Sequence, residues 1–245
     1  MNLTDKQRLA LKNANTKAKI HQKNIAHLVI DKFISNNIDV KYIDKIKVFI
    51  ETNVSMTTKI KCNILSNFIL DPILKNKIEL TPTDISYIDY RKKKEDVLFN
   101  KAYSEAEASE RVKYGSLNLK NLISGDPLAS MYGDTTIFYK NDIKDRVTFI
   151  YGNSEASMMY ICTFKYFEHI LFHCPIEDIK LLVSLIDSQS NNKNFKSYIE
   201  IQLHGVVDLT KDVEKITMDN KTYNLNKELV DKFIKTYPSI DVLIY

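Results

Sequence analysis

The nine residues "SYIEIQLHG" (197–205) carry most of what can be inferred about the fold and function of this chain. Apolar residues at positions 199, 201 and 203 alternate with Glu200, Gln202 and His204, and a glycine follows. Because side chains of a β-strand alternate between two faces, the pattern predicts a strand with one apolar and one polar face. The polar face fits an ordinary half-exposed strand. It also fits the floor of a cleft, where a carboxylate stabilises positive charge and an imidazole moves a proton.

The composition is that of a globular protein with a sizeable core. The chain has 245 residues, of which 44% are hydrophobic and 27% charged, and these are normal values. Its three cysteines show no CxxC spacing, which argues against a zinc module and a disulfide framework and favours a reducing compartment. We expect no signal peptide and no membrane partner, because no apolar run approaches the ~18 residues of a membrane span.

The positive charge is concentrated at the amino-terminal end. Residues 1–50 hold ten Lys or Arg and four Asp, a balance of +6, so the remainder of this +4 chain carries −2. Such a segment could contact nucleic acid or another acidic partner. No aromatic residues interleave the early basic run, so solvated helix faces are the better interpretation, and nucleic acid is kept as an alternative.

The placement of glycine predicts an α+β fold. All five glycines lie between residues 115 and 205, which indicates helices before this region and strands with tight turns within it. We predict a helical amino-terminal region, 1–53, and a core, 54–245. Apolar spacing predicts helices at 4–36, 41–52, 62–72, 83–109, 158–173, 176–187 and 227–236. Further strands are predicted at 54–60, 112–119, 135–140, 146–152 and 240–245, with 135–140 and 146–152 paired as a hairpin.

Two further segments carry candidate chemistry. Arg91, Glu95, Phe99 and Tyr103 recur at spacings of four and would lie along one helical stripe. "ERVKYG" (110–115) places an arginine, which suits phosphates, before a glycine, which allows close backbone approach. A salt bridge and a turn would explain that second segment equally well.

The chain lacks the common catalytic motifs. No Walker loop, GxGxxG, HExxH or GxSxG sequence is present. His169 and His173 have a spacing that can hold zinc on a helix, but no third ligand lies nearby in the sequence. We therefore predict no metal site and interpret the pair as surface histidines.

Four segments together resemble a known family. In chain order they are "ERVKYGSLNL" (110–119), "YGDTTIFYK" (132–140), "RVTFIYGNS" (146–154) and "YIEIQLHGVVDLTKDVEKITMD" (198–219). This order is similar to the CteC-like mono-ADP-ribosyltransferases, bacterial effectors that modify threonine in ubiquitin. A weaker match extends upstream to "LKNKIELTPTD" (74–84) and to the stripe that begins at Arg91.

The resemblance implies an ADP-ribosyltransferase-like fold that binds NAD, as co-substrate, in a cleft between two small sheets. Glu200 would be the catalytic carboxylate, and His204 would orient it or accept a proton from the acceptor hydroxyl. The implied NAD-binding residues are Asn76, Thr81, Arg91, Arg111, Tyr114, Gly115 and Gln202, with Arg111 on the pyrophosphate. The histidine of the family's first strand is absent here, where Thr57, Thr58 and Lys59 stand instead.

The expected function is therefore transfer of ADP-ribose from NAD to a protein hydroxyl, with ubiquitin as the leading acceptor. Breaking the nicotinamide–ribose bond builds positive charge on the ribose, as in glycoside hydrolysis, and a carboxylate stabilises that charge. The resemblance also implies a secreted effector or toxin acting in a host cytoplasm, or a cytoplasmic protein. The alternatives are an NAD hydrolase, a nucleic-acid-directed transferase and a non-catalytic binding module of the same fold.

Overall fold

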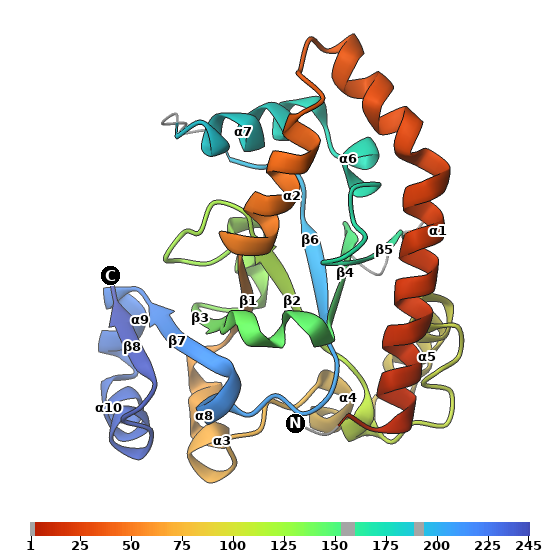
Figure 1. Ribbon diagram of the computed structural model, residues 1–245. Coiled ribbons are helices and arrows are strands. Elements are labelled where there is room, and N and C mark those ends of the chain that lie inside the picture. Colours follow the sequence, from red (N-terminus) through yellow and green to blue (C-terminus); the bar gives the residue numbers. More distant parts are fainter. Residues whose placement is uncertain (1–2, 153–159, 189–193) are drawn as a thin grey trace.

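The fold is mixed α and β, built on one large sheet. The computed structural model describes residues 3–152, 160–188 and 194–245 (Figure 1). The strands in this part of the chain are β1 (Ser55–Ile60), β2 (Lys113–Asn118), β3 (Thr135–Tyr139), β4 (Val147–Tyr151), β5 (Ile161–Thr163), β6 (Ile199–Leu203), β7 (Val213–Met218) and β8 (Asp241–Ile244). They form an eight-stranded sheet in the order β5-β4-β6-β2-β1-β3-β7-β8.

Helices surround this sheet. They are α1 (Asp5–Ser35), α2 (Tyr42–Thr52), α3 (Leu65–Leu70), α4 (Lys77–Leu80), α5 (Ile85–Phe99), α6 (Ile170–His173), α7 (Ile176–Ile186), α8 (Leu209–Asp212), α9 (Asn220–Leu225) and α10 (Lys227–Thr236). Short 3-10 turns complete the described part: η1 (Cys62–Ile64), η2 (Ala108–Glu110), η3 (Pro127–Tyr132) and η4 (Asn141–Arg146). Figure 1 shows α1 running along one side of the molecule, while α9 and α10 lie on the other side beside β7 and β8.

The sheet separates at its centre. β1 pairs with β2 over Ser55–Thr57, and from Thr57 to Ile60 it pairs with β3. β2 pairs with β6 on its other side, over Lys113–Ser116. The halves β5-β4-β6-β2 and β1-β3-β7-β8 are therefore joined by a ladder of three residue pairs. Beyond that ladder the Thr58 hydroxyl donates to the Tyr114 carbonyl oxygen at 2.9 Å.

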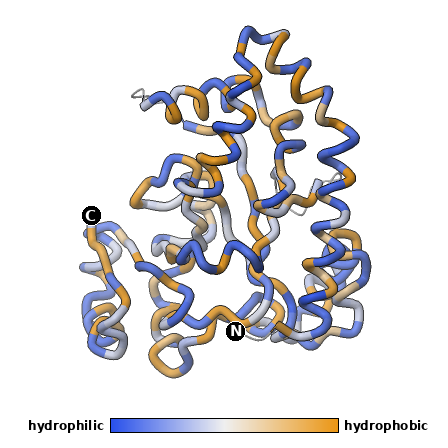
Figure 2. The backbone as a smooth tube through the Cα atoms, viewed as in Figure 1, coloured by the Kyte–Doolittle hydropathy of each residue, from blue (hydrophilic) through white to orange (hydrophobic). Residues whose placement is uncertain are grey.

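The long helix α1 packs closely because its inner stripe is made of alanine. Ala10, Ala14 and Ala18 recur every four residues and are fully buried, so this part of the helix approaches β5 and α5 at short range. Thr4 caps its first turn in a capping box with Gln7. Figure 2 shows hydrophilic and hydrophobic residues alternating along this helix, as expected for one buried side.

Several sequence predictions are confirmed and others are wrong. The helix capped by Thr4, the helix at 227–236 and the strand at 54–60 are confirmed to within a residue or two. The predicted hairpin is wrong, because β3 pairs with β1 and β7 whereas β4 pairs with β5 and β6. The predicted helix at 83–109 ends at Phe99, since Asn100 and Lys101 adopt positive φ angles. Within 158–173 the described residues form β5 and the short helix α6 instead of one helix.

The two small sheets that the resemblance implies are replaced by the two joined halves of one sheet. The predicted boundary after residue 53 falls between α2 and β1, although α1 packs directly on β5 of the core.

Candidate functional site

A cleft lies where β1 and β2 separate. Its volume is about 360 Å³, within the range of small-molecule sites. Residues of β1, β2, β6, α4, α5 and η3 line it. Its described lining includes five basic residues, which are Lys59, Lys75, Lys77, Arg91 and Lys113. It also includes four tyrosines, which are Tyr87, Tyr114, Tyr132 and Tyr198.

Glu200 is the one carboxylate among the described residues that line the cleft. It lies on β6 opposite Ser116 of β2 and Ile150 of β4, and its side chain is largely buried. The Gln202 amide donates to Glu200 Oε1 at 3.2 Å. Arg91 interacts with Glu200 electrostatically. At position 200 the polar face of β6 is therefore directed into a cleft, which is one of the two interpretations that the sequence allowed.

Arg91 and Tyr114 form one wall of the cleft. The Arg91 guanidinium carbon lies 4.0 Å from the centroid of the Tyr114 ring, a cation–π arrangement. The Tyr114 hydroxyl donates to Glu95 Oε1 at 3.0 Å. Burial and the neighbouring Glu95 raise the pKa of Tyr114 well above its ordinary value, so the phenol stays protonated. Both residues belong to the predicted NAD-binding set, and the structure brings them together beside Glu200.

Arg111 lies outside the cleft. Its side chain is 1% exposed, and Nη1 donates to Glu95 Oε2 at 2.6 Å while Nη2 donates to the Tyr103 carbonyl oxygen at 2.6 Å. Burial raises the pKa of Glu95, whereas Arg111 and the Tyr114 hydroxyl favour its ionised form. The expected contact between Arg111 and a pyrophosphate is therefore not supported, because its guanidinium already serves a buried ion pair.

Gln202 and His204 are covered by protein, although they share the polar face of β6 with Glu200. The His204 ring is hydrogen-bonded to Tyr103 at 2.7 Å and to Thr148 at 3.1 Å, and it packs in a T-shaped arrangement with Phe99. Burial, with Arg146 and Lys113 nearby, lowers the pKa of His204 to about 3, so the ring is neutral near pH 7. His204 does not line the cleft. The expected proton transfer from an acceptor hydroxyl to His204 is therefore not supported.

The remaining predicted residues take different positions. Asn76 lines the cleft and caps α4, since its Oδ1 accepts from the Glu79 amide at 3.0 Å. Thr81 ends α4, donates to the Lys77 carbonyl oxygen at 2.8 Å and is outside the described lining. Gly115 lines the cleft, where a Cβ would lie 2.2 Å from the Thr57 carbonyl oxygen. Glycine therefore allows β1 and β2 to approach closely where their ladder ends.

The predicted site set left out seven basic or aromatic lining residues, which are Lys59, Lys75, Lys77, Tyr87, Lys113, Tyr132 and Tyr198. Tyr132 and Tyr198 both lie within the quoted family segments, so their position was the available signal. The Lys113 ammonium donates to the carbonyl oxygens of Ser109 and Gly205 at 2.9 and 3.4 Å, among others. The Lys113 ammonium is therefore occupied by backbone carbonyl oxygens of the cleft wall, and we do not assign it to a ligand. Lys59 lies on β1, the strand in which the resemblance implied a histidine, and burial lowers its pKa.

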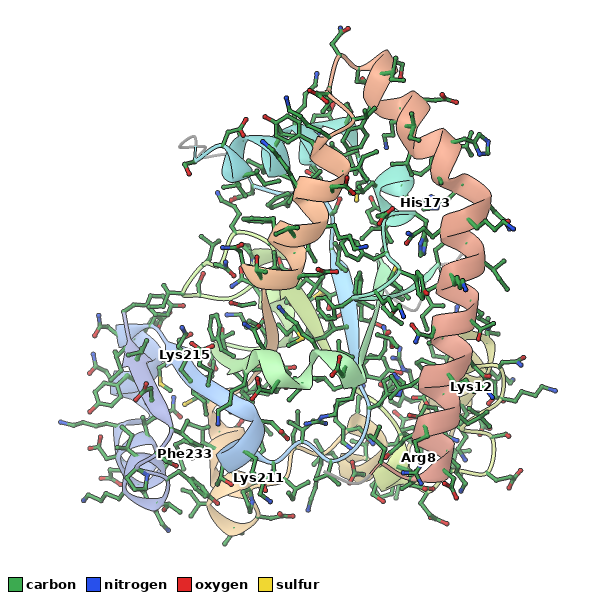
Figure 3. The ribbon with its side chains drawn as sticks, in the orientation of Figure 1. Arg8, Lys12, His173, Lys211, Lys215 and Phe233 are labelled. Carbon is green, nitrogen blue, oxygen red and sulfur yellow. The ribbon has the colours of Figure 1, made fainter. Side chains whose placement is uncertain are left out.

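Of the two predicted surface histidines, His169 is buried, contrary to expectation, whereas His173 is partly exposed. His169 is fully buried, and its Nε2 lies 3.3 Å from Cys162 Sγ and 3.2 Å from the Ile161 carbonyl oxygen. Burial and the neighbouring His21 lower the pKa of His169 to about 4. His173 lies in α6 (Figure 3) and stacks on Tyr160. In the described ranges, no group of three or more His, Cys, Asp or Glu side chains is arranged to hold a metal ion.

Comparison with known proteins adds one match. Residues 84–185 match the model of a family described as "Protein of unknown function (DUF3626)". The matched segment begins at α5, includes Arg91, Glu95 and Tyr114, and ends before Glu200. No curated protein matches the chain.

Two findings bear on macromolecular partners. None of the helices in the described part of the chain combines the length and hydrophobicity that a bilayer crossing requires. Figure 3 places Arg8 and Lys12 on α1, well separated from Lys211 in α8 and Lys215 in β7. Basic side chains therefore occur on distant parts of the molecule as well as in the amino-terminal segment.

Proposed function

We propose that the chain is an NAD-dependent mono-ADP-ribosyltransferase that modifies a protein hydroxyl, with threonine as the acceptor residue and ubiquitin as the leading acceptor. One observation carries the proposal. Glu200 is the single carboxylate in the described lining of a cleft that is otherwise rich in cations and tyrosines. The acceptor, and action as an effector in a host cytoplasm, derive from the family resemblance alone.

The cleft chemistry fits a dinucleotide. Phosphates are bound by Lys and Arg, and aromatic side chains stack on planar bases. Lys75 already forms an ion pair with Asp71 at 3.3 Å, so its charge is partly neutralised. The Lys77 ammonium instead lies 4.0 Å from the centroid of the Tyr87 ring. Arg91 lies near Glu200 itself. We therefore assign Arg91 and Lys77 to the diphosphate of NAD, with the tyrosines as stacking surfaces.

The reaction requires little beyond a placed carboxylate. The bond between the ribose C1′ and the nicotinamide nitrogen breaks, and its electron pair leaves with nicotinamide. Positive charge develops on C1′ and the ring oxygen, where the Glu200 carboxylate stabilises it. The acceptor hydroxyl oxygen then supplies an electron pair to C1′, and its proton passes to solvent. The products are therefore the ADP-ribosylated acceptor, free nicotinamide and one proton.

The fold is consistent with this proposal. The resemblance implies NAD in a cleft between two sheets, and here a cleft lies between the two halves of one sheet. Its lining comes from β1 on one side and from β2 and β6 on the other. We therefore propose that the core is an ADP-ribosyltransferase-like fold in which the halves remain joined by the three-pair ladder.

The test is incubation of the chain with NAD and ubiquitin, followed by mass spectrometry. We expect ubiquitin to gain the mass of one ADP-ribose and nicotinamide to be released. Glu200→Gln should lower the rate by about 10²–10³-fold, the usual cost of removing such an electrostatic stabiliser. Glu214→Gln is the matched control, because it neutralises a half-exposed carboxylate on β7 outside the cleft. A Glu200→Gln variant as active as the parent would contradict the assignment.

Other outcomes separate the alternatives. Nicotinamide release without an adduct would identify an NAD hydrolase, and an adduct on added nucleic acid would identify a nucleic-acid-directed transferase. If NAD binds but stays intact with every acceptor, the chain is a binding module. If NAD does not bind at all, the proposal fails.

A further inference from the structure

We propose that Tyr103, His204, Thr148 and Gln202 form a hydrogen-bonded chain that positions the Glu200 carboxylate in the cleft. The inference deepens the proposed function, and it rests on that function only for the catalytic role of Glu200. The successive donor–acceptor distances are 2.7 Å for Tyr103–His204, 3.1 Å for His204–Thr148, 3.0 Å for Thr148–Gln202 and 3.2 Å for Gln202–Glu200. The hydrogen-bonded chain leads from the segment that follows α5, across β4 and β6, to the cleft.

The donors and acceptors allow one direction only. An ionised Glu200 only accepts, so Gln202 presents its NH₂ group and its Oε1 is left as an acceptor. Thr148 must then donate its single hydroxyl hydrogen to Gln202, and it accepts from His204. His204 therefore carries its hydrogen on Nε2, and Nδ1 accepts from the Tyr103 hydroxyl. All four hydrogen bonds point toward the carboxylate.

Burial makes this arrangement rigid. Tyr103, Thr148, Gln202 and His204 are all 0% exposed. Phe99 packs in T-shaped arrangements against both the Tyr103 and the His204 rings, with centroid distances of 5.4 and 5.0 Å. In a site closed to solvent, aligned hydrogen bonds strengthen one another, and a broken one leaves a buried polar group unsatisfied. The Gln202 amide cannot rotate without losing its bonds to Thr148 and Glu200.

The role of the chain follows from what Glu200 is proposed to do. A carboxylate that stabilises a developing charge is effective when its position is fixed before the reaction. A lone glutamine donor would be free to turn its oxygen toward the carboxylate, which would repel it. The Thr148 hydroxyl excludes that orientation, and His204 and Tyr103 in turn fix the hydroxyl. Gln202, Thr148, His204 and Tyr103 are thus positioning residues.

The kinetic test removes one hydroxyl. Thr148→Val keeps the side-chain shape, and we expect kcat for nicotinamide release to fall on the order of tenfold, as for other outer-shell partners, with the KM for NAD unchanged. Thr148→Ser should restore the rate because it restores the hydroxyl. Thr217→Val is the matched control, since Thr217 is an equally buried strand threonine whose hydroxyl bonds the Ile123 carbonyl oxygen at 2.6 Å. Parental kcat in Thr148→Val would overturn the positioning role.

A second readout does not depend on activity. The chain has four glutamines, so selective ¹⁵N-glutamine labelling gives a simple amide spectrum, in which Gln202→Leu identifies the Gln202 side-chain signals. Tyr103→Phe, which keeps the ring, and Thr148→Val should both shift those signals, whereas Thr217→Val should not. Unshifted signals would overturn the hydrogen-bonded chain, whatever the measured activity. If the signals shift but the parent protein releases no nicotinamide, the hydrogen-bonded chain stands and the proposed function fails.

Discussion

Breaking the buried ion pair between Arg111 and Glu95 tests whether Arg111 is structural or contacts nucleotide. In Glu95→Leu the Arg111 guanidinium keeps only its bond to the Tyr103 carbonyl oxygen among the contacts described above, in a site where its side chain is 1% exposed. Removing one partner of a buried pair costs about 3–5 kcal/mol. For a chain of this length, each kcal/mol lowers the unfolding temperature by about 2–4 °C. We therefore expect a decrease of roughly 6–20 °C.

The assay is a double-mutant cycle followed by thermal and urea unfolding. Combining Glu95→Leu with Arg111→Met should recover much of the lost stability, because a buried pair replaced by apolar groups is often tolerated. Asp5→Asn is the control, since the Arg8–Asp5 pair has the same 2.6 Å separation but side chains 58% and 96% exposed. It should change the free energy of unfolding by less than about 1 kcal/mol.

The reasoning is refuted by either of two results. Glu95→Leu could change the free energy of unfolding by less than about 1 kcal/mol, which would show that the pair contributes no more than an exposed one. Alternatively, Arg111→Met could unfold like the parent yet lose NAD binding. That second result would restore the role in phosphate binding that the family resemblance implied.

Three further predictions concern pH, backbone packing and thiols. Because burial lowers the pKa of His169 to about 4 and of His204 to about 3, the folded state binds fewer protons than the unfolded one as pH falls below about 6.5. Stability in urea should fall by about 1.4 kcal/mol per pH unit for each histidine from pH 6.5 toward those values, and His169→Gln should reduce the slope. Gly115→Ala should destabilise by about 1–3 kcal/mol in urea unfolding, because its Cβ would overlap the Thr57 carbonyl; parental stability would contradict this. The three buried free cysteines, whose thiol pKa values burial raises, should react with a thiol reagent only on unfolding, so fast labelling of the folded protein would contradict their burial.

Local signals predicted the elements well where they were strong. Thr4 and the apolar spacing after it predicted α1, and the alternation at 199–203 predicted β6. The hairpin prediction failed because Asn141 and Asp142 resemble turn residues, while strand partners are chosen by long-range packing. β3 and β4 are neighbours in sequence but lie in opposite halves of the sheet.

The candidate site was predicted in part, for a comparable reason. Strand alternation allowed Glu200 to line a cleft and the family resemblance singled it out, and the structure places it in the cleft. The same alternation could not show that α5 and the segment after it cover His204, because cover depends on elements about a hundred residues away. Nor could it separate Arg91 from Arg111, since both are arginines near tyrosines and only tertiary burial assigns one to the cleft and the other to Glu95.

The three-pair ladder between β1 and β2 has a consequence for ligand binding. Any molecule seated against Lys59 on one side and Glu200 on the other contacts both halves of the sheet. Its binding energy therefore also opposes the separation of the two four-stranded blocks, whose strands are hydrogen-bonded to each other by the ladder at Ser55–Thr57. Occupancy of the cleft should then act as a removable cross-link, slowing amide hydrogen exchange most at this junction and making the two blocks unfold together.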